Sequence, residues 1–173
     1  MTSTKTYVTG AMRAATGALI ERRVSYPIAA SDIRRWAIAV YYPDPPPDAF
    51  WDEQAASEGL SGGLVAPEEF NPFAWLAAEP KGPQVIDRAD PDFIERHIGI
   101  EGPGLRFQLN GGIEVEYFEP MRPGDIITSE RRLHEYSERE GRLGLMLFTT
   151  VEDTWTNQRG EIVKRQRQTG IRY

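Results

Sequence analysis

The feature that most constrains the fold is an alternation of apolar and polar residues in the C-terminal part of the chain. Ile113, Val115 and Tyr117 alternate with glycine and glutamate, which gives one apolar and one charged face. Three further runs of strand character follow, at residues 126–136, 143–155 and 162–172. The joints at 140–142 and 157–160 contain glycine and polar residues, as hairpin turns do. These features predict an antiparallel meander of about four long strands.

The N-terminal part combines one strand-like run, residues 17–28, with helical patterns. Apolar residues at helical spacing begin at Ile33, behind Ser31 and Asp32 as N-cap candidates. This helix must stop near Tyr42, because four prolines follow within the next five residues. A second, short helix is predicted over residues 49–58, ending at a glycine.

A third helix is predicted from about Pro67 to Ala78. Apolar residues recur there at helical spacing and occupy more than one side, so the helix is expected to be buried. Residues 79–91 are predicted to form a loop that is rich in proline, glycine and charge. One strand, three helices and a meander predict an α+β fold, with a curved antiparallel sheet around this long central helix. A length of 173 residues is expected to give a single domain over 1–173.

The composition excludes several classes of function. There are no cysteines, so disulfides, thiolate metal sites and cysteine nucleophiles are excluded, and His97 and His134 are too far apart in sequence for a ligand-like pair. A net charge of -6 argues against nucleic acid as a partner. The basic residues of the last run are interpreted as a solvated strand face: Lys164, Arg165, Arg167 and Arg172.

No run approaches the roughly 20 apolar residues of a membrane span, so no membrane association is expected. Residues 1–7 are polar and contain no apolar stretch of the kind found in a secretory signal. The expected location is therefore the cytoplasm.

An ordered set of segments covering nearly the whole chain resembles the MaoC-like acyl dehydratases, which have the hot-dog fold. More narrowly, it resembles the N-terminal dehydratase-like domain of two-part hydratases in this group. The segments are Asp32-Ile33, Trp36-Ala37, Asp52 to Ala56, Gly62 to Pro67, Leu109 to Glu114, Arg122 to Asp125, Glu138 to Arg142, Thr156 to Gln158, Gly160-Glu161 and Gln168-Thr169.

The resemblance implies an acyl-thioester ligand, carried by coenzyme A or an acyl carrier protein, and a place in lipid metabolism. It implies a lyase reaction, the reversible addition of water to a 2-enoyl thioester, with no cofactor beyond the carrier of the thioester and no metal. In active members an Asp and a His hold and activate the water, while a helix N-terminal amide hydrogen-bonds the thioester oxygen.

At the positions that match this active motif, the chain departs from the family. The motif's Asp falls on Tyr42 and its His on Pro47, while Asp44 stands in for an Asn and Pro45 matches. The expected oxyanion donor falls on Pro67, which has no N–H. Three missing roles predict the non-catalytic half of an enoyl-CoA hydratase or dehydratase. Such a chain would shape the acyl pocket and form a homodimer or pair with a catalytic hot-dog subunit.

The candidate ligand-binding residues are Tyr42, Phe70, Asn110, Gly111 and Gly112. Each also has a structural interpretation. Tyr42 and Phe70 could simply pack, and the glycines could form a β-bulge instead of admitting a ligand. Two other functions stay open. One is a self-sufficient enzyme, either a hydratase with non-standard residues such as Tyr42 or His97, or a thioesterase that uses Glu68 or Glu69. The other is an acyl-CoA binding module without chemistry.

Overall fold

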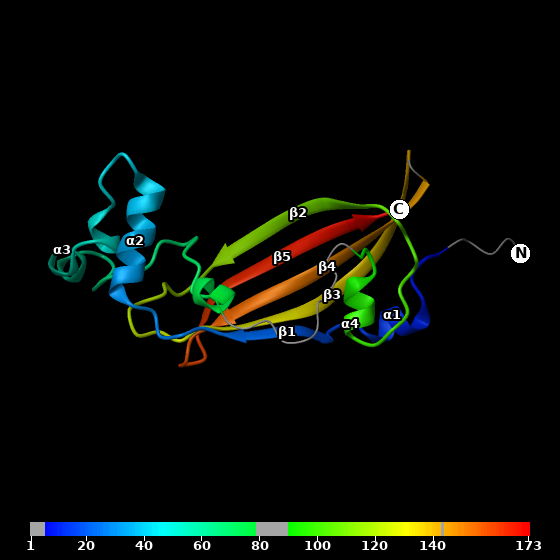
Figure 1. Ribbon diagram of the computed structural model, residues 1–173, viewed down its shortest axis with the longest axis horizontal. Coiled ribbons are helices and arrows are strands. Elements are labelled where there is room, and N and C mark those ends of the chain that lie inside the picture. The colour runs from blue at the N-terminus through cyan, green and yellow to red at the C-terminus, as the bar shows by residue number, and fades with distance from the viewer. Residues whose placement is uncertain (1–5, 79–89, 143) are drawn as a thin grey trace, which may run out of the picture.

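The computed structural model describes residues 6–78, 90–142 and 144–173. Within these residues, five antiparallel strands form one sheet in the order β1-β3-β4-β5-β2 (Figure 1). The strands are β1 (Leu19–Val24), β2 (Gln108–Tyr117), β3 (Thr128–Gly141), β4 (Gly144–Thr156) and β5 (Ile162–Arg172). Hairpins join β3 to β4 and β4 to β5, so these three strands form a meander, and the strand predicted within residues 17–28 is confirmed as β1. The predicted meander of about four strands needs correction, because β2 pairs with β5 and not with β3.

Helices lie at both ends of this sheet. The α-helices are α1 (Gly10–Ala14), α2 (Ala30–Tyr41), α3 (Glu53–Glu58) and α4 (Phe93–His97), and the 3₁₀ helices are η1 (Asp48–Phe50) and η2 (Ala74–Ala78). In Figure 1, α2 and α3 lie beyond one end of the strands, while α1 and α4 lie near the other end. None of the helices in the described ranges has the length and apolar character that a membrane span needs.

The pairing of the strands defines an inner and an outer face of the sheet. Leu133 of β3 lies opposite Val151 of β4, and both are buried against Ile94 and Ile98 from the α4 region. This is the inner face. The next residue of β4, Glu152, points to the outer face, where it pairs across the sheet with Arg167. Successive residues of β4 thus point to opposite faces of the sheet.

The apolar core of the described residues is divided between the two ends of the sheet. At one end, a cluster under α2 combines Ile33 with Phe70, Phe73 and Met121. At the other end, smaller clusters hold α1 and α4 against β3 and β4 through Met12, Leu133 and Leu147. Charged and polar side chains are prominent on the inner face between these clusters, and Arg131 and Asp153 are examples.

The predicted long helix from Pro67 to Ala78 is wrong. Only its last five residues are helical, and they form the 3₁₀ helix η2. Pro72 interrupts the pattern because it has no N–H and restricts the backbone of Asn71. The Asn71 side chain accepts a hydrogen bond from the backbone N–H of Phe73 (3.0 Å), which stabilises a turn in place of a helix.

Three smaller predictions also need correction. The N-cap of α2 is Ala29, and neither Ser31 nor Asp32 caps the helix. The single helix predicted over 49–58 is divided into η1 and α3, because the Asp52 side chain caps a new helix by accepting from two backbone N–H groups. The sequence pattern missed α1 and α4, which are five residues each. Of the predicted loop 79–91, residues 79–89 lie outside the described part.

Candidate functional site

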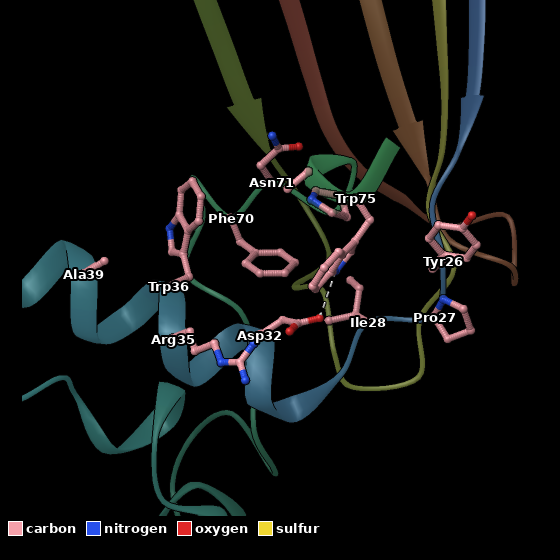
Figure 2. Close-up of a pocket in the computed structure, with 12 residues that line it drawn as sticks. Tyr26, Pro27, Ile28, Asp32, Arg35, Trp36, Ala39, Phe70, Asn71 and Trp75 are labelled. Atoms are coloured by element: carbon pink, nitrogen blue, oxygen red, sulfur yellow. Dashed lines mark hydrogen bonds between the residues drawn. The ribbon is translucent and has the colours of Figure 1, made fainter. Parts of the chain in front are cut away.

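A cavity of about 260 Å³ lies between α2 and residues 70–75 (Figure 2). Its floor and walls are largely apolar, with Ile28, Trp36, Ala39, Phe70, Pro72 and Trp75 among the lining residues. Concave, apolar sites with a few polar groups are the usual form of small-molecule binding sites. This cavity is therefore the candidate site.

The helical spacing of α2 explains one wall of the cavity. Asp32, Arg35, Trp36 and Ala39 are separated by three, four and seven residues, so they share one face of the helix. An adjacent face buries Ile33 and Ala37 in the core and thereby fixes how α2 is rotated. One face of α2 thus anchors the helix, and the other lines the cavity.

The second wall comes from the segment in which the predicted helix fails. Phe70 is buried and meets Trp36 edge to face, with ring centroids 5.8 Å apart and planes at 77°. Trp75 is 54% exposed, and its indole N–H donates to the Asp32 carboxylate at 3.3 Å. Figure 2 shows Phe70 between the two tryptophans, with the Trp75–Asp32 hydrogen bond crossing toward α2.

No acid–base pair of the family type reaches this cavity from the described residues. His97 is held by the backbone carbonyl of Ile20 at 2.7 Å from its Nε2 atom. His134 lies on the outer face, with its Nδ1 atom 4.0 Å from the Glu152 carboxylate. Within the described ranges, no group of three His, Asp or Glu side chains is placed to hold a metal ion. The cavity can bind a molecule, but no histidine is among its described lining residues, so it offers no Asp–His pair for general acid–base chemistry.

The five candidate ligand-binding residues are not brought together. Phe70 lines the cavity, whereas Tyr42 ends α2 outside it with 81% of its surface exposed. Gly111 and Gly112 line a second, polar hollow of about 350 Å³ on the outer face of the sheet, beside His134 and Arg167. Asn110 adjoins this hollow. A ligand role for these residues stays a prediction.

Of the two interpretations of the glycines, the bulge is present. The register of β2 against β5 shifts between Asn110 and Gly112, and the Asn110 side chain accepts from the Gly112 N–H at 3.0 Å. A Cβ atom at Gly111 would lie 3.0 Å from both the Ile171 side chain and the Thr169 carbonyl oxygen. Gly112 has a φ of +130°, which side chains rarely adopt. Backbone geometry alone thus accounts for both glycines.

Glu69, one of the two carboxylates considered for a thioesterase beside Glu68, points toward the sheet. It accepts a hydrogen bond from the Tyr117 hydroxyl and lies 3.7 Å from the Nζ atom of Lys164. Lys164 itself is buried, and its ammonium group stacks over the Trp155 ring at 4.8 Å. Glu69 thus ties residues 67–70 to β2 and β5.

A buried ionic network at the α4 end of the sheet was not predicted from the sequence. Arg172 donates to Glu95 (2.7 and 2.9 Å), to Asp92 (2.9 Å) and to Thr149 (2.8 Å). The Tyr136 hydroxyl donates to Glu95 at 2.7 Å. Burial, together with the hydrogen bond and charge of Glu95, raises the pKa of Tyr136 above its usual value.

This network corrects the interpretation of the basic residues in β5 as one solvated face. Lys164 and Arg172 are buried, whereas Arg165 and Arg167 pair with Glu116 and Glu152 on the outer face. The period of two in a strand contained this signal, because residues 164 and 172 are an even number apart and share a face. Lys164 and Arg172 are both paired within the protein, so they do not form a phosphate-binding stripe.

A third feature of the inner face is the carboxyl of Asp153. Burial raises its pKa above the usual value of 3.8, although Arg131, Arg23 and Ser129 act in the opposite direction. Arg131 lies 3.9 Å from this carboxylate, and Ser129 donates to it at 3.4 Å. Neither contact is short enough to offset the loss of hydration.

The chain is similar to proteins of known family and structure. A family model described as the FAS1-like dehydratase domain region matches residues 14–166. No curated protein sequence matches the chain at a significant level. The MaoC-like dehydratase from Rhodospirillum rubrum is 24% identical, with 92% of each chain covered and a TM-score of 0.54.

Two similar solved structures are complexes from Mycobacterium tuberculosis. A chain of the ChsH1-ChsH2 complex is 18% identical, with 93% of this chain and 86% of that chain covered and a TM-score of 0.61. A chain of the C-terminally truncated HadBC complex, a 3R-hydroxyacyl-ACP dehydratase, is 23% identical, with coverages of 88% and 96% and a TM-score of 0.52. At these identities the similarity shows the fold, and it confirms the predicted α+β hot-dog class.

Proposed function

Because this chain belongs to the FAS1-like dehydratase domain family, we propose that it is the non-catalytic half of an acyl-thioester hydratase or dehydratase. It pairs with a catalytic hot-dog chain and shapes the pocket for the acyl group of an enoyl-CoA or an acyl-carrier thioester. The thioester carrier is the only other component required, and no metal takes part. The reaction adds water to the double bond or removes it.

The observation that carries this proposal is the absence of catalytic groups at the matching positions. Tyr42 and Pro47 stand where active members have Asp and His, and proline cannot titrate. No helix begins at Pro67; instead, the Phe70 N–H donates to the Pro67 carbonyl in a turn (2.9 Å). The backbone here therefore lacks a helix N-terminus that could stabilise a thioester oxyanion.

The shape of the α2 end supports a role in accommodating the acyl group. Where the resemblance predicts a long central helix, residues 67–73 form turns and the helix is reduced to η2. The space beside α2 is apolar and aromatic, as an acyl chain requires. A subunit that contributes this space would allow its catalytic partner to act on bulky acyl groups.

Pairing with a second hot-dog chain is supported by the edge of the sheet and by similar structures. β2 is an edge strand in the described sheet, and Leu109 and Ile113 on it are about half exposed. Open edges of this kind are generally covered or paired. Two of the similar structures are heteromeric complexes, which favours a catalytic partner over a second copy of this chain.

The test is turnover of a medium-chain 2-enoyl-CoA, followed by loss of the conjugated thioester absorbance. The chain alone is expected to show no turnover. Adding a catalytic hot-dog chain with an intact Asp and His motif is expected to give turnover on acyl groups that the partner alone accepts poorly. A variant of the partner without its motif His is the matched control and should abolish the activity. Turnover by the lone chain would overturn the proposal.

A binding module without chemistry is the second candidate, favoured by the cavity that lacks an acid–base pair. The same experiment separates the two functions. A module would bind the acyl-CoA but leave the activity of every catalytic hot-dog partner unchanged, and the two chains would elute separately on size exclusion.

A further inference from the structure

The two edges of the described sheet differ in length and composition. β1 has six residues, and Glu21, Arg22 and Arg23 give it a run of charges. Short, charged edge strands resist pairing with another chain. β2 forms the opposite edge (Figure 1) and has ten residues, of which the first seven, from Gln108 to Glu114, are all exposed. β2 is therefore the edge at which a second chain can add a strand.

The charged residues of β2 are both acidic. The strand contains Glu114 and Glu116 and no Lys, Arg or His. The two glutamates lie on the outer face of the sheet, opposite Arg167 and Arg165 of β5, respectively. Arg165 lies 3.5 Å from Glu116, whereas Arg167 bonds Glu152 at 2.8 Å, and no hydrogen bond or ion pair within the described ranges engages the Glu114 carboxylate. The edge strand therefore presents uncompensated negative charge to a second chain.

Pairing of β2 with the same strand of a second copy would bring like charges together. Two copies that pair antiparallel along this edge are related by a two-fold axis, which passes between the two copies of one residue of β2. With the axis at Glu114, this residue lies opposite its own copy, and with the axis at Val115 it lies opposite Glu116 of the second copy. With the axis at Ile113 or Glu116, Glu114 lies diagonal to a glutamate of the second copy. Like charges directly opposite destabilise a strand pair, and diagonal positions about 7–8 Å apart are within reach of long side chains.

We propose that the carboxylates of β2 oppose self-pairing and select a catalytic hot-dog chain whose edge strand carries lysine or arginine opposite Glu114 and Glu116. Opposite charges in facing positions stabilise a strand pair, so the same two residues that repel a second copy attract a basic strand. Ile113 adds to the contact, because it is half exposed and a second strand would cover it. This inference rests on the proposed function for the identity of the partner, and it adds the chemistry by which that partner is recognised.

The experiment builds a basic edge strand from this chain itself. The probe is the Glu114→Lys/Glu116→Lys variant, and fluorophore-labelled wild type is titrated with unlabelled wild type or with the probe in fluorescence anisotropy. The wild type should bind the probe at least about ten-fold more tightly than it binds itself, because repulsive cross-strand pairs become attractive ones. The probe should bind itself no more tightly than the wild type binds itself, because lysine then opposes lysine. The preference for the probe should shrink as salt rises from about 0.05 to about 0.5 M.

Three further variants locate the contact on β2. Glu130→Lys/Glu140→Lys makes the same change of charge on β3, which β4 and β5 separate from β2, and it should bind the wild type less than about two-fold more tightly than the wild type binds itself. Ile113→Gln introduced into the probe should weaken its binding to the wild type by about two- to ten-fold, because less apolar surface is covered. Glu114→Lys alone leaves Glu116 in place and should show a smaller preference of the same sign. Circular dichroism and the thermal midpoint check that each variant is folded.

Two results would overturn the inference. The wild type could bind itself at least as tightly as it binds the probe, or the control variant on β3 could bind the wild type as tightly as the probe does. The turnover experiment separates this failure from a failure of the proposed function. A chain that shows no preference for the probe but confers activity on a catalytic partner keeps its function as a subunit and loses the selection by charge. A chain that prefers the probe but confers no activity keeps the selection of a basic strand and loses the role in a hydratase.

Discussion

The two ends of the sheet differ in where their charged side chains lie. At the α4 end, Arg172, Glu95 and Asp92 are buried and saturate one another with hydrogen bonds. At the α2 end, the interior is apolar and aromatic, and the charged side chains stand at the mouth of a cavity. Buried charges are tolerated only when they are paired. The charged groups of the α4 end bond one another and are therefore not available to bind a ligand. The arrangement at the other end leaves space for a ligand beside α2.

The comparison shows which charged residues serve the fold and which are available for binding. From the sequence, Arg172 was expected on a solvated strand face, yet it is buried and holds α4 and residues 91–95 to β5. The exposed Arg35 looks unremarkable in sequence, yet it lines the cavity. The neighbours of each arginine decide whether its guanidinium group stabilises the fold or can contact a ligand.

The largest expected effect comes from breaking the paired end. Arg172→Met leaves Glu95, whose exposed fraction is 0%, as an uncompensated buried carboxylate. The free energy of unfolding should fall by about 3–5 kcal/mol, measured by urea denaturation at pH 7.

The matched control is Arg167→Met on the outer face of the same strand. Arg167 bonds Glu152 at 2.8 Å, but its side chain is 40% exposed. Solvent screens this pair, so the free energy of unfolding should fall by much less than in Arg172→Met. Equal losses for Arg172→Met and Arg167→Met would show that burial does not set the strength of the network, and the contrast between the two ends would fail.

A smaller effect is expected from trimming the apolar end. Ile33→Val removes one methyl group from a fully buried side chain under α2. The expected cost is about 0.5–1.5 kcal/mol in the same denaturation experiment, since the remaining side chain keeps the shape of the core. A cost as large as that of Arg172→Met would place the stability of the protein at the α2 end instead.

Much of the sheet could be predicted from the sequence because alternation is a local signal. The two faces of β2 can be assigned from local sequence alone, because Ile113, Val115 and Tyr117 alternate with glycine and glutamate. The helix predicted over 67–78 does not form, because Pro72 has no N–H and removes a hydrogen bond that the helix would need. The apolar spacing alone does not show this. Local steric rules decided the outcome where periodicity alone was ambiguous.

The candidate site was less predictable because it depends on contacts between distant segments. Phe70 was among the predicted residues, but its partner Trp36 lies 34 positions earlier and their edge-to-face contact is tertiary. The Arg172–Glu95 pair spans 77 positions, and no local pattern indicates which carboxylate will meet the arginine. The replacement of the family's Asp and His by Tyr42 and Pro47, in contrast, could be recognised from single sequence positions.

The carboxyl of Asp153 predicts how stability at the middle of the inner face depends on pH. Its pKa is raised by burial, so its contribution to stability is present below the unfolded value near 3.8 and is lost as pH rises through the folded value. Asp153→Asn removes this loss. The stability of the variant relative to the wild type should therefore increase as pH rises from 4 toward 7, in urea denaturation at each pH. A relative stability that decreases with pH would show that Arg131 outweighs burial.

The smallest effect on the stability of the isolated chain is expected at Tyr42. Its side chain is 81% exposed, so Tyr42→Phe should change the free energy of unfolding by less than about 0.5 kcal/mol. If Tyr42 contacts the ligand in the paired enzyme, the same variant should raise KM about two- to ten-fold with kcat unchanged, because a ground-state hydrogen bond is lost. A lowered kcat would instead give Tyr42 a part in the reaction and contradict the non-catalytic role. An unchanged KM would remove Tyr42 from the ligand-binding residues and leave the cavity beside α2 as the binding site of this chain.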